Sequence, residues 1–318
     1  MLRPLFGLLF IVASASGKAQ IREIKNPKHE IMVISDNDNY TFNYSDRYYT
    51  NGLTLAYSYV GKKSDKLIEG YSSKVIRSVI LGQHIYTPSD IDTELDQLYD
   101  RPYAGWLFIR YSTTRFLPND ITVDFGAELG LSGAYSLAEP IQKWWHGVVK
   151  YKQPQGWNKQ IASGFGINFT SSASKGWRIS KFLDLTSTTG LQFGTHFQNA
   201  SQDLSLRIGA FNSLDYSAHK NSKLSLTKRS TCLKSTEHFL SAGVKLTSVL
   251  QNALIEGSSW PKQSPHQENV HPQFTTYQLG WVSSIKAYTI KIVWYRMSPE
   301  VIGGTDHKFV RLFLSHRF

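Results

Sequence analysis

Apolar residues recur at every second position through several stretches of this 318-residue chain. The clearest stretches are residues 52–59, 203–211 and 287–297. A period of two is typical of a β-strand that has one face in apolar surroundings and the other in polar surroundings. Arg207 and Lys291 fall on the polar side of their stretches. The pattern predicts an all-β protein, although alternation alone also fits a soluble β-sandwich.

The chain contains about twelve strand-like segments, an even number of the kind that bacterial membrane barrels have. No internal repeat or linker divides them, so we expect one domain. Together these features predict a twelve-stranded antiparallel β-barrel. The expected strands begin near the following residues: His29, Tyr49, Val75, Tyr103, Asp120, Asn158, Phe182, Gln202, Thr236, Gln273, Ala287 and Lys308.

Two kinds of segment interrupt the strand pattern. Residues 136–156 could hold a short helix, because apolar side chains recur there at helical spacing. Residues 212–235 and 258–271 are polar and are expected to be loops. The four residues with helical spacing are Ile141, Trp144, Trp145 and Val148.

The first 19 residues have the features of a signal peptide. Arg3 supplies the positive charge, an apolar run follows, and small residues end the segment, so the mature chain would span residues 20–318. After the first 19 residues the chain has no run of 18 apolar residues, so no transmembrane helix is expected. Mean hydropathy is -0.29 and aromatic residues make up 13% of the chain. An exported chain that is polar on average and rich in aromatics fits an outer-membrane barrel, with Tyr and Trp at the interfaces.

The net charge of +11 and the single cysteine, Cys232, narrow the classes of partner and fold. One cysteine argues against a disulfide-stapled secreted domain. An exported chain seldom meets nucleic acid, so we expect none as a partner. The positive charge fits either anionic lipid phosphates or merely a soluble basic surface.

The chain ends on an amphipathic strand and an aromatic residue. Val310, Leu312, Leu314 and Phe318 share one parity, and Phe318 is the last residue. This ending resembles the assembly signal of bacterial outer-membrane barrels.

Residues 36–52 form an oxygen-rich run of Asp, Asn and Tyr between two expected strands. Oxygen ligands suit a hard cation. The run nevertheless departs from the EF-hand pattern, since it lacks the Gly at the sixth place and the Glu at the twelfth. The chain also has no G-x-S-x-G elbow, H-E-x-x-H or Walker loop. By itself, the run therefore fits either a cation site or a polar turn.

Several motifs in fixed order resemble the outer-membrane lipid A 3′-O-deacylase family of the LpxR type. They cover about the first half of the chain, and the second half matches only in strand pattern and the terminal Phe. The motifs are Asp36-Asn37-Asp38, residues 46–52, residues 83–88, residues 100–105, then Glu139, Gln142 and His146, then Gly156-Trp157 with Gln160.

The resemblance implies a calcium-dependent esterase in a bacterial outer membrane that removes the 3′-acyloxyacyl chain of lipid A. It implies that His146 is the catalytic base and that Asn37 and Asp38 bind Ca²⁺ and assist catalysis. Thr50 matches the family's active-site hydroxyl residue. Such residues suit ester hydrolysis, which needs an activated water and a stabilised oxyanion. His146 could instead belong to an interfacial belt, and Thr50 could be an ordinary strand residue.

The chain departs from the family at Lys152, where related enzymes can carry a glutamate. Lys152 could instead bind a lipid A phosphate. A carboxylate that orients His146 would then come from Glu139, Asp36 or Asp46. Smaller departures are Ala134 and Ala138, where the family often has Pro and Gly, so the shape of this loop and the level of activity stay open.

Other motif residues are expected to have structural roles. Asp46 and Arg47 could pair with each other or cap the turn, and residues 100–105 should form a turn-and-pairing element. Strand parity places Asn37 away from Asp38 unless a bulge or turn intervenes.

Two other classes of function remain open. One is a non-enzymatic barrel, a channel or adhesin, although about twelve strands are few for a water-filled pore. The other is a barrel phospholipase, which should show a serine nucleophile beside a histidine. The sequence leaves the oligomeric state unknown.

Overall fold

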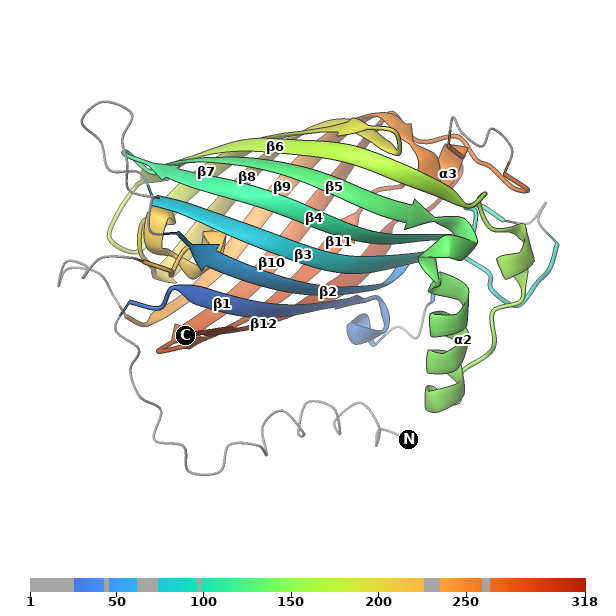
Figure 1. Cartoon of the computed structure of the whole chain (residues 1–318), viewed down its shortest axis with the longest axis horizontal. Coiled ribbons are helices and arrows are strands. Elements are labelled where there is room, and N and C mark those ends of the chain that lie inside the picture. The colour runs from blue at the N-terminus through green and yellow to red at the C-terminus, as the bar shows by residue number, and fades with distance from the viewer. Residues whose placement is uncertain (1–25, 43–45, 62–73, 96–98, 226–234, 259–263) are drawn as a thin grey trace.

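The computed structural model describes residues 26–42, 46–61, 74–95, 99–225, 235–258 and 264–318, which form a closed antiparallel barrel of twelve strands (Figure 1). The proposed signal peptide, residues 1–19, and Cys232 lie outside the described residues. The strands are β1 His29–Asn37, β2 Tyr48–Val60, β3 Lys74–Thr87, β4 Ala104–Leu117, β5 Ile121–Ser132, β6 Gly164–Arg178, β7 Leu183–Gly194, β8 Phe197–Ala210, β9 Glu237–Asn252, β10 Gln273–Ile285, β11 Tyr288–Met297 and β12 His307–Arg317.

Each strand pairs with its neighbours in sequence, and β1 closes the ring by pairing with β12. Closure leaves no strand edge, so every strand finds partners for its backbone groups on both sides. The predicted twelve-stranded antiparallel barrel is confirmed.

Two predicted strand starts are wrong by several residues. The strand expected near Asn158 begins at Gly164, because residues 156–159 form the 3-10 helix η4 (Gly156–Lys159) with Trp157 buried. The strand expected near Gln202 begins earlier, at Phe197. Polar residues lie near the starts of both strands, so the alternation of apolar residues did not locate these starts.

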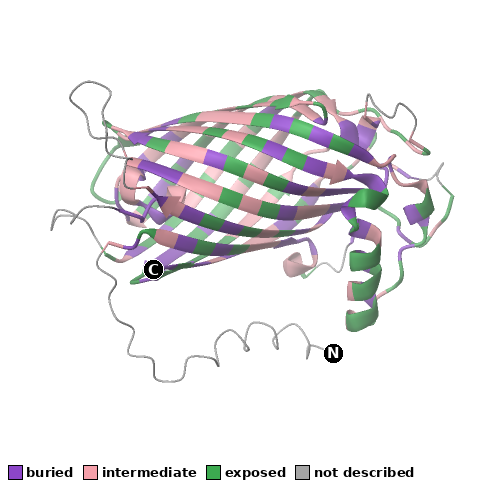
Figure 2. Ribbon diagram, in the orientation of Figure 1, coloured by how far each residue is buried: buried purple, intermediate pink, exposed green. Residues whose placement is uncertain are grey.

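The two faces of the wall differ in polarity, and Figure 2 shows the resulting alternation of buried and exposed residues along the strands. On β8, Leu204, Leu206 and Ile208 are exposed on the outside, whereas Arg207 is fully buried inside. Apolar residues outside and charged residues inside are the arrangement of a barrel surrounded by lipid. Among the described residues, no helix is both long and apolar enough to cross a membrane.

An even number of strands places the start of β1 and the end of β12 at the same end of the barrel, called here the terminal end. The predicted helix in residues 136–156 is present as α2 (Ala138–Val149) and lies at the opposite, distal end (Figure 1). The shorter α3 (Ala253–Glu256) and the 3-10 helices η1 (Asn39–Thr41) and η3 (Gly133–Ser136) also lie at the distal end.

Residues 211–225, called here the plug segment, fold against the inside of the wall at the terminal end. This part of an expected polar loop contains η5 (Leu214–Tyr216) and η6 (Ala218–Lys220). Leu214, Ala218 and Leu224 are buried. Lys74 of β3 donates to three of its backbone carbonyls, those of Asp215, Ser222 and Leu224.

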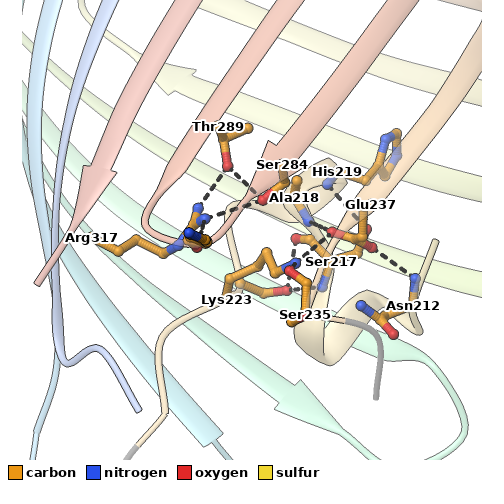
Figure 3. Close-up of polar contacts among 12 residues, drawn as sticks. Asn212, Ser217, Ala218, His219, Lys223, Ser235, Glu237, Ser284, Thr289 and Arg317 are labelled. Atoms are coloured by element: carbon orange, nitrogen blue, oxygen red, sulfur yellow. Dashed lines mark hydrogen bonds and ion pairs between the residues drawn. The ribbon is translucent and has the colours of Figure 1, made fainter. Parts of the chain in front are cut away.

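Glu237 at the start of β9 fastens the plug segment to the wall (Figure 3). Its carboxylate accepts the backbone N–H groups of Asn212 and Ala218, each at 2.7 Å. It also lies 3.4 Å from the ammonium of Lys223, and all of these groups are buried. A single carboxylate therefore satisfies two donors and a charge.

We predict that Glu237→Gln loosens the plug segment. A glutamine amide nitrogen cannot accept the Ala218 N–H bond, and loss of a hydrogen bond to a charged group costs about 1.5–3 kcal/mol. That loss corresponds to roughly ten- to hundredfold faster amide exchange. Hydrogen exchange at Ala218, followed by mass spectrometry, measures it. Glu256→Gln is the matched control, since Glu256 accepts the Asn252 N–H at the distal end. Unchanged exchange at Ala218 in Glu237→Gln would contradict the assigned fastening.

Candidate active site

The last two residues of β1, Asp36 and Asn37, have different surroundings. Asp36 is buried in the wall, where it accepts bonds from Arg311 at 2.7 and 2.6 Å and from the Tyr49 hydroxyl at 2.7 Å. The side-chain oxygen of Asn37 accepts the backbone N–H of Asn39 at 2.8 Å. Asp36 is thus fully engaged, and Asn37 shapes the turn that follows.

Asp38 leaves the strand geometry, because it precedes η1 with helical backbone angles (φ -73°, ψ -30°). One carboxylate oxygen, Oδ2, accepts the backbone N–H of Arg47 at 3.0 Å. The other, Oδ1, is buried and has no hydrogen-bond partner within the described part of the chain. A turn therefore follows Asn37, the exception that strand parity allowed for, and it orients Asp38 independently of β1.

Thr50 lies at a bulge between β2 and β3. Tyr49 pairs with Tyr86 and Asn51 pairs with Ile85, so Thr50 has no residue opposite it. Its carbonyl accepts the Asp38 N–H at 3.3 Å, which places the two residues side by side. Its hydroxyl is buried without a partner among the described residues. Bulges often redirect side chains next to active sites.

Helix α2 is held against the rim of the barrel by a close approach at Gly105. A Cβ atom on Gly105 would lie 2.0 Å from the Ser136 Oγ and 2.4 Å from the Ala138 Cβ, so no larger residue fits without displacement. Ala138, Gln142 and His146 are the buried residues of the helix. Because they are four residues apart, they share one face, and that face carries the site.

Both ring nitrogens of His146 have partners. Nε2 lies 2.8 Å from the Asp46 Oδ2, and both side chains are 5% exposed. Nδ1 bonds to the carbonyl of Lys152 at 2.5 Å. A carbonyl only accepts, so Nδ1 carries a proton and Nε2 is the nitrogen that can exchange one. The Tyr151 ring packs edge-on against the imidazole at 5.2 Å.

A second hydrogen-bonded layer supports Asp46. Gln142 donates to the same Asp46 Oδ2 at 3.2 Å, and its amide oxygen accepts the Trp157 indole N–H at 2.8 Å. Trp157 is fully buried and packs against Tyr103. A fixed chain of bonds from Trp157 through Gln142 therefore holds the carboxylate beside His146.

The pKa values of His146 and Asp38 both lie above their usual range. Burial lowers the pKa of His146, but hydrogen bonds to Asp46 and to the Lys152 carbonyl, with the Asp46 charge, outweigh burial and raise it. Burial raises the pKa of Asp38 well above normal, and the charge of Asp46 adds to this effect. Burial and the Asp46 charge thus disfavour the ionised form of Asp38, which a nearby positive charge would stabilise.

Of the three carboxylates considered as partners for His146, only Asp46 contacts it. Glu139 pairs with Lys143 at 2.6 Å on the exposed side of α2. The prediction that Asp46 and Arg47 pair with each other is wrong, because the described residues show no ion pair between them. The guanidinium of Arg47 instead donates to the Thr305 hydroxyl at 3.3 Å and to the Asp306 carbonyl at 3.2 Å.

The side chain of Lys152 points away from this group of residues. It is 71% exposed and pairs with Asp92. Only its backbone carbonyl contacts the site, through the Nδ1 of His146. Binding of a phosphate by Lys152 stays a prediction, and it would take place on the surface around the site.

Residues 100–105 form a bend that leads into β4, where Ala104 and Gly105 pair with β3, which agrees with the expected turn-and-pairing element. Arg101 is buried, lies 2.8 Å from Glu300 and stacks 4.3 Å from the Tyr86 ring. The Asp100 carboxylate accepts the Tyr48 hydroxyl at 2.6 Å. These contacts tie the loop after β3 to the loop before β12.

The oxygens available for a cation come mainly from Asp38. The described residues contain no group of three or more His, Cys, Asp or Glu side chains arranged to hold a metal. Between the end of β1 and the start of β2, three buried side-chain oxygens nevertheless lack hydrogen-bond partners among the described residues, those of Asp38, Asn39 and Thr50. One charged and two neutral oxygens fit a hard cation that draws its other ligands from water or substrate.

Sequence reasoning missed Tyr151 and gave no role to Gln142 or Trp157. The spacing of four residues between Gln142 and His146 was a usable signal, because it puts both on one helical face. Trp157 belonged to a motif of the resemblance, Gly156-Trp157, but no local spacing links it or Tyr151 to the site, since their contacts depend on how the loop after α2 returns to the barrel.

The closed barrel with an apolar outside defines the class of the protein as an outer-membrane β-barrel. Its sequence matches the family described as outer membrane protein LpxR over residues 5–318, and the chain belongs to that family. No sequence among curated proteins matches the chain.

The fold is similar to solved barrels of the same class. LpxR from Salmonella typhimurium has a TM-score of 0.71 at 18% identity, covering 91% of this chain and 100% of that one. The β domain of the Bordetella autotransporter BrkA has a TM-score of 0.46 at 9% identity, covering 92% of this chain and 99% of that one.

We predict that Asp46→Asn lowers the pKa of His146, because burial then acts without the opposing carboxylate. NMR titration of ¹³C-labelled histidine in micelles measures the shift, with His146→Gln to assign the signal. In the wild type the pKa is raised, so the stabilising pair is complete below the ordinary histidine value of 6.5 and is lost as pH rises through the raised value. Asp46→Asn should remove that pH dependence of stability.

Glu139→Gln is the control for this titration, since Glu139 lies on the same helix but pairs with Lys143. It should leave the His146 signal unchanged. Equal titration curves for wild type and Asp46→Asn would show that the carboxylate does not control the imidazole.

Proposed function

We propose that this protein is a calcium-dependent esterase that hydrolyses the 3′-acyloxyacyl ester of lipid A. The observation that carries the proposal is the buried pair of His146 and Asp46 on α2 and the β1–β2 loop, at the barrel rim. Membership of the LpxR family supports lipid A as the substrate. We orient the distal end toward the outside, where the lipid A leaflet lies.

In this proposal His146 is the base that takes a proton from the attacking water. The Lys152 carbonyl fixes the tautomer, so Nε2 is the accepting nitrogen. In the described geometry Nε2 donates to Asp46, so His146 must first release that proton to act as a base. The water then either bridges the two groups or replaces that bond. Asp46 then stabilises the imidazolium that forms, and Gln142 holds Asp46 in place.

Asp38 and Asn37 are the proposed calcium-binding residues. The support is the buried, unpartnered Oδ1 of Asp38 and its raised pKa, both of which a bound cation would relieve. Bound calcium would supply positive charge for the developing oxyanion. The Asn37 side chain is engaged with Asn39, so its backbone carbonyl is the better oxygen.

Thr50 is proposed to orient the reacting groups. Its hydroxyl is buried and unpartnered next to Asp38, so it is available to donate to the water or to the oxyanion. The charged Lys152 side chain could bind a lipid A phosphate if it exchanged Asp92 for it.

The alternative functions have less support from the described residues. A channel requires an open lumen, whereas the plug segment packs inside the terminal end. A phospholipase requires an accessible serine beside a histidine. The described partners of His146 are Asp46, Lys152 and Tyr151. Ser132 does lie 3.1 Å from the Nε2 of His196, but both of these residues are buried.

We predict that His146→Ala reduces deacylation by about 10²- to 10⁴-fold, the usual contribution of a general base. Mass spectrometry of lipid A from membranes that contain the protein measures the loss of the acyloxyacyl chain. His271→Ala is the control, because His271 is exposed in a distal loop. Wild-type deacylation by His146→Ala would refute the mechanism, and wild-type protein that leaves lipid A intact would refute the substrate.

We predict that Asp38→Asn weakens calcium binding by roughly tenfold or more, because it removes the one charged oxygen proposed for the cation. Calorimetric titration of the detergent-solubilised barrel with CaCl₂ measures this without relying on activity. Asp90→Asn is the control, since Asp90 is exposed in a distal loop. Equal affinity in Asp38→Asn and wild type would exclude Asp38 as a ligand.

A further inference from the structure

Helix α2 has an apolar face that no part of the described chain covers. Ile141, Trp144 and Val148 are 41%, 66% and 51% exposed, and Leu137, the residue just before the helix, is 53% exposed. At 3.6 residues per turn the three helical residues fall within an arc of about 60°, which makes a continuous stripe that Leu137 precedes. We call these four residues the apolar stripe. A helix in water normally turns polar residues outward, so an exposed stripe of this kind needs a partner.

The helix has two other faces. The buried face of Ala138, Gln142 and His146 packs against the barrel. The polar face carries Lys143 and Lys150, which are exposed. On the helical wheel the buried face lies between the apolar stripe and the polar face. With the buried face against the barrel, the other two faces look in different directions, about 140° apart on the helical wheel.

The position of α2 indicates which surroundings each of these two faces meets. Figure 1 shows the helix at the distal end, lying across the barrel axis and extending past the outline of the barrel. A membrane surrounds the barrel wall, so a helix across the axis lies along the membrane surface. One outward face then meets lipid and the other meets water.

We propose that the apolar stripe docks into the outer leaflet at the boundary between acyl chains and headgroups. The stripe continues the apolar outside of the wall, since exposed Leu129 of β5 is followed by exposed Tyr135 and Leu137 before α2 begins. Trp with aliphatic residues on one face and Lys on the other is the composition of an interfacial helix. The occupant is lipid rather than a second copy of the chain.

Docking would set the depth of the active site. Trp144 lies two residues before His146, so the stripe in the leaflet would hold the imidazole at the level of the acyl esters. This consequence rests on the proposed function, whereas the docking itself does not.

The test uses the full mature barrel, reconstituted one per nanodisc in phosphatidylcholine without lipid A. Cys232→Ser removes the native thiol, and single cysteines carry a polarity-sensitive fluorophore. Trp144→Cys and Val148→Cys place the label on the apolar stripe, and Lys143→Cys and Lys150→Cys place it on the polar face as matched controls. Quenching by acyl-brominated phosphatidylcholine is compared with quenching by aqueous iodide.

Labels on the apolar stripe should be quenched several-fold more by brominated lipid than those on the polar face, and the order should reverse with iodide. Iodide quenching that is equal at all four positions would overturn the proposal, because the helix would then stand in water. A blue-shifted stripe label that brominated lipid does not quench would also overturn it, since protein would cover the stripe. The nanodiscs contain no lipid A, so failure here is distinct from failure of the proposed esterase.

Discussion

The closed ring of backbone hydrogen bonds is the constraint on which the rest of the structure depends. In lipid an unpaired backbone group is costly, so β1 through β12 must pair without a gap. Within that ring the strands offer little freedom to aim a side chain. The candidate site therefore lies where regular strand pairing ends or becomes irregular, at the turn that begins with Asp38 and at the bulge of Thr50.

Charge pairing inside the barrel separates structural carboxylates from reactive ones. Asp36 pairs with Arg311, and Asp184 pairs with Arg207, each with two hydrogen bonds from the guanidinium. Such buried pairs compensate each other and have no capacity left for chemistry. Among the described residues, Asp46 is paired with a titratable imidazole and not with an arginine or lysine, and one oxygen of Asp38 has no partner. These two carboxylates are the ones whose state a substrate or cation can change.

The fold could be predicted because the alternation of side chains is a local property of each strand. The site could be predicted only in part, because its contacts join segments far apart in the chain. Parity allowed Asn37 and Asp38 to come together only if a bulge or turn intervened, and it could not show that Asp38 caps a 3-10 turn. The pair of Asp46 and His146 depends on the Gly105 contact that fixes α2 to the rim. The plug segment was expected to be a simple loop because it is polar. Its polar side chains instead have partners on the wall, since Ser217 accepts from Arg207 and Lys220 donates to Ser174.

Helix α2 links these levels of organisation, because one short segment must satisfy three surroundings at once. Its buried face needs small or hydrogen-bonded residues against the rim, which Ala138, Gln142 and His146 provide. An ordinary amphipathic helix turns its apolar face toward the protein, whereas here the face toward the barrel carries Gln142 and His146 and the apolar stripe is exposed. Removing that stripe would leave the contacts of His146 with Asp46 intact, so the stripe is not needed to build the site. Its presence is therefore best explained by where the helix must lie, at the surface of the lipid that the proposed reaction consumes.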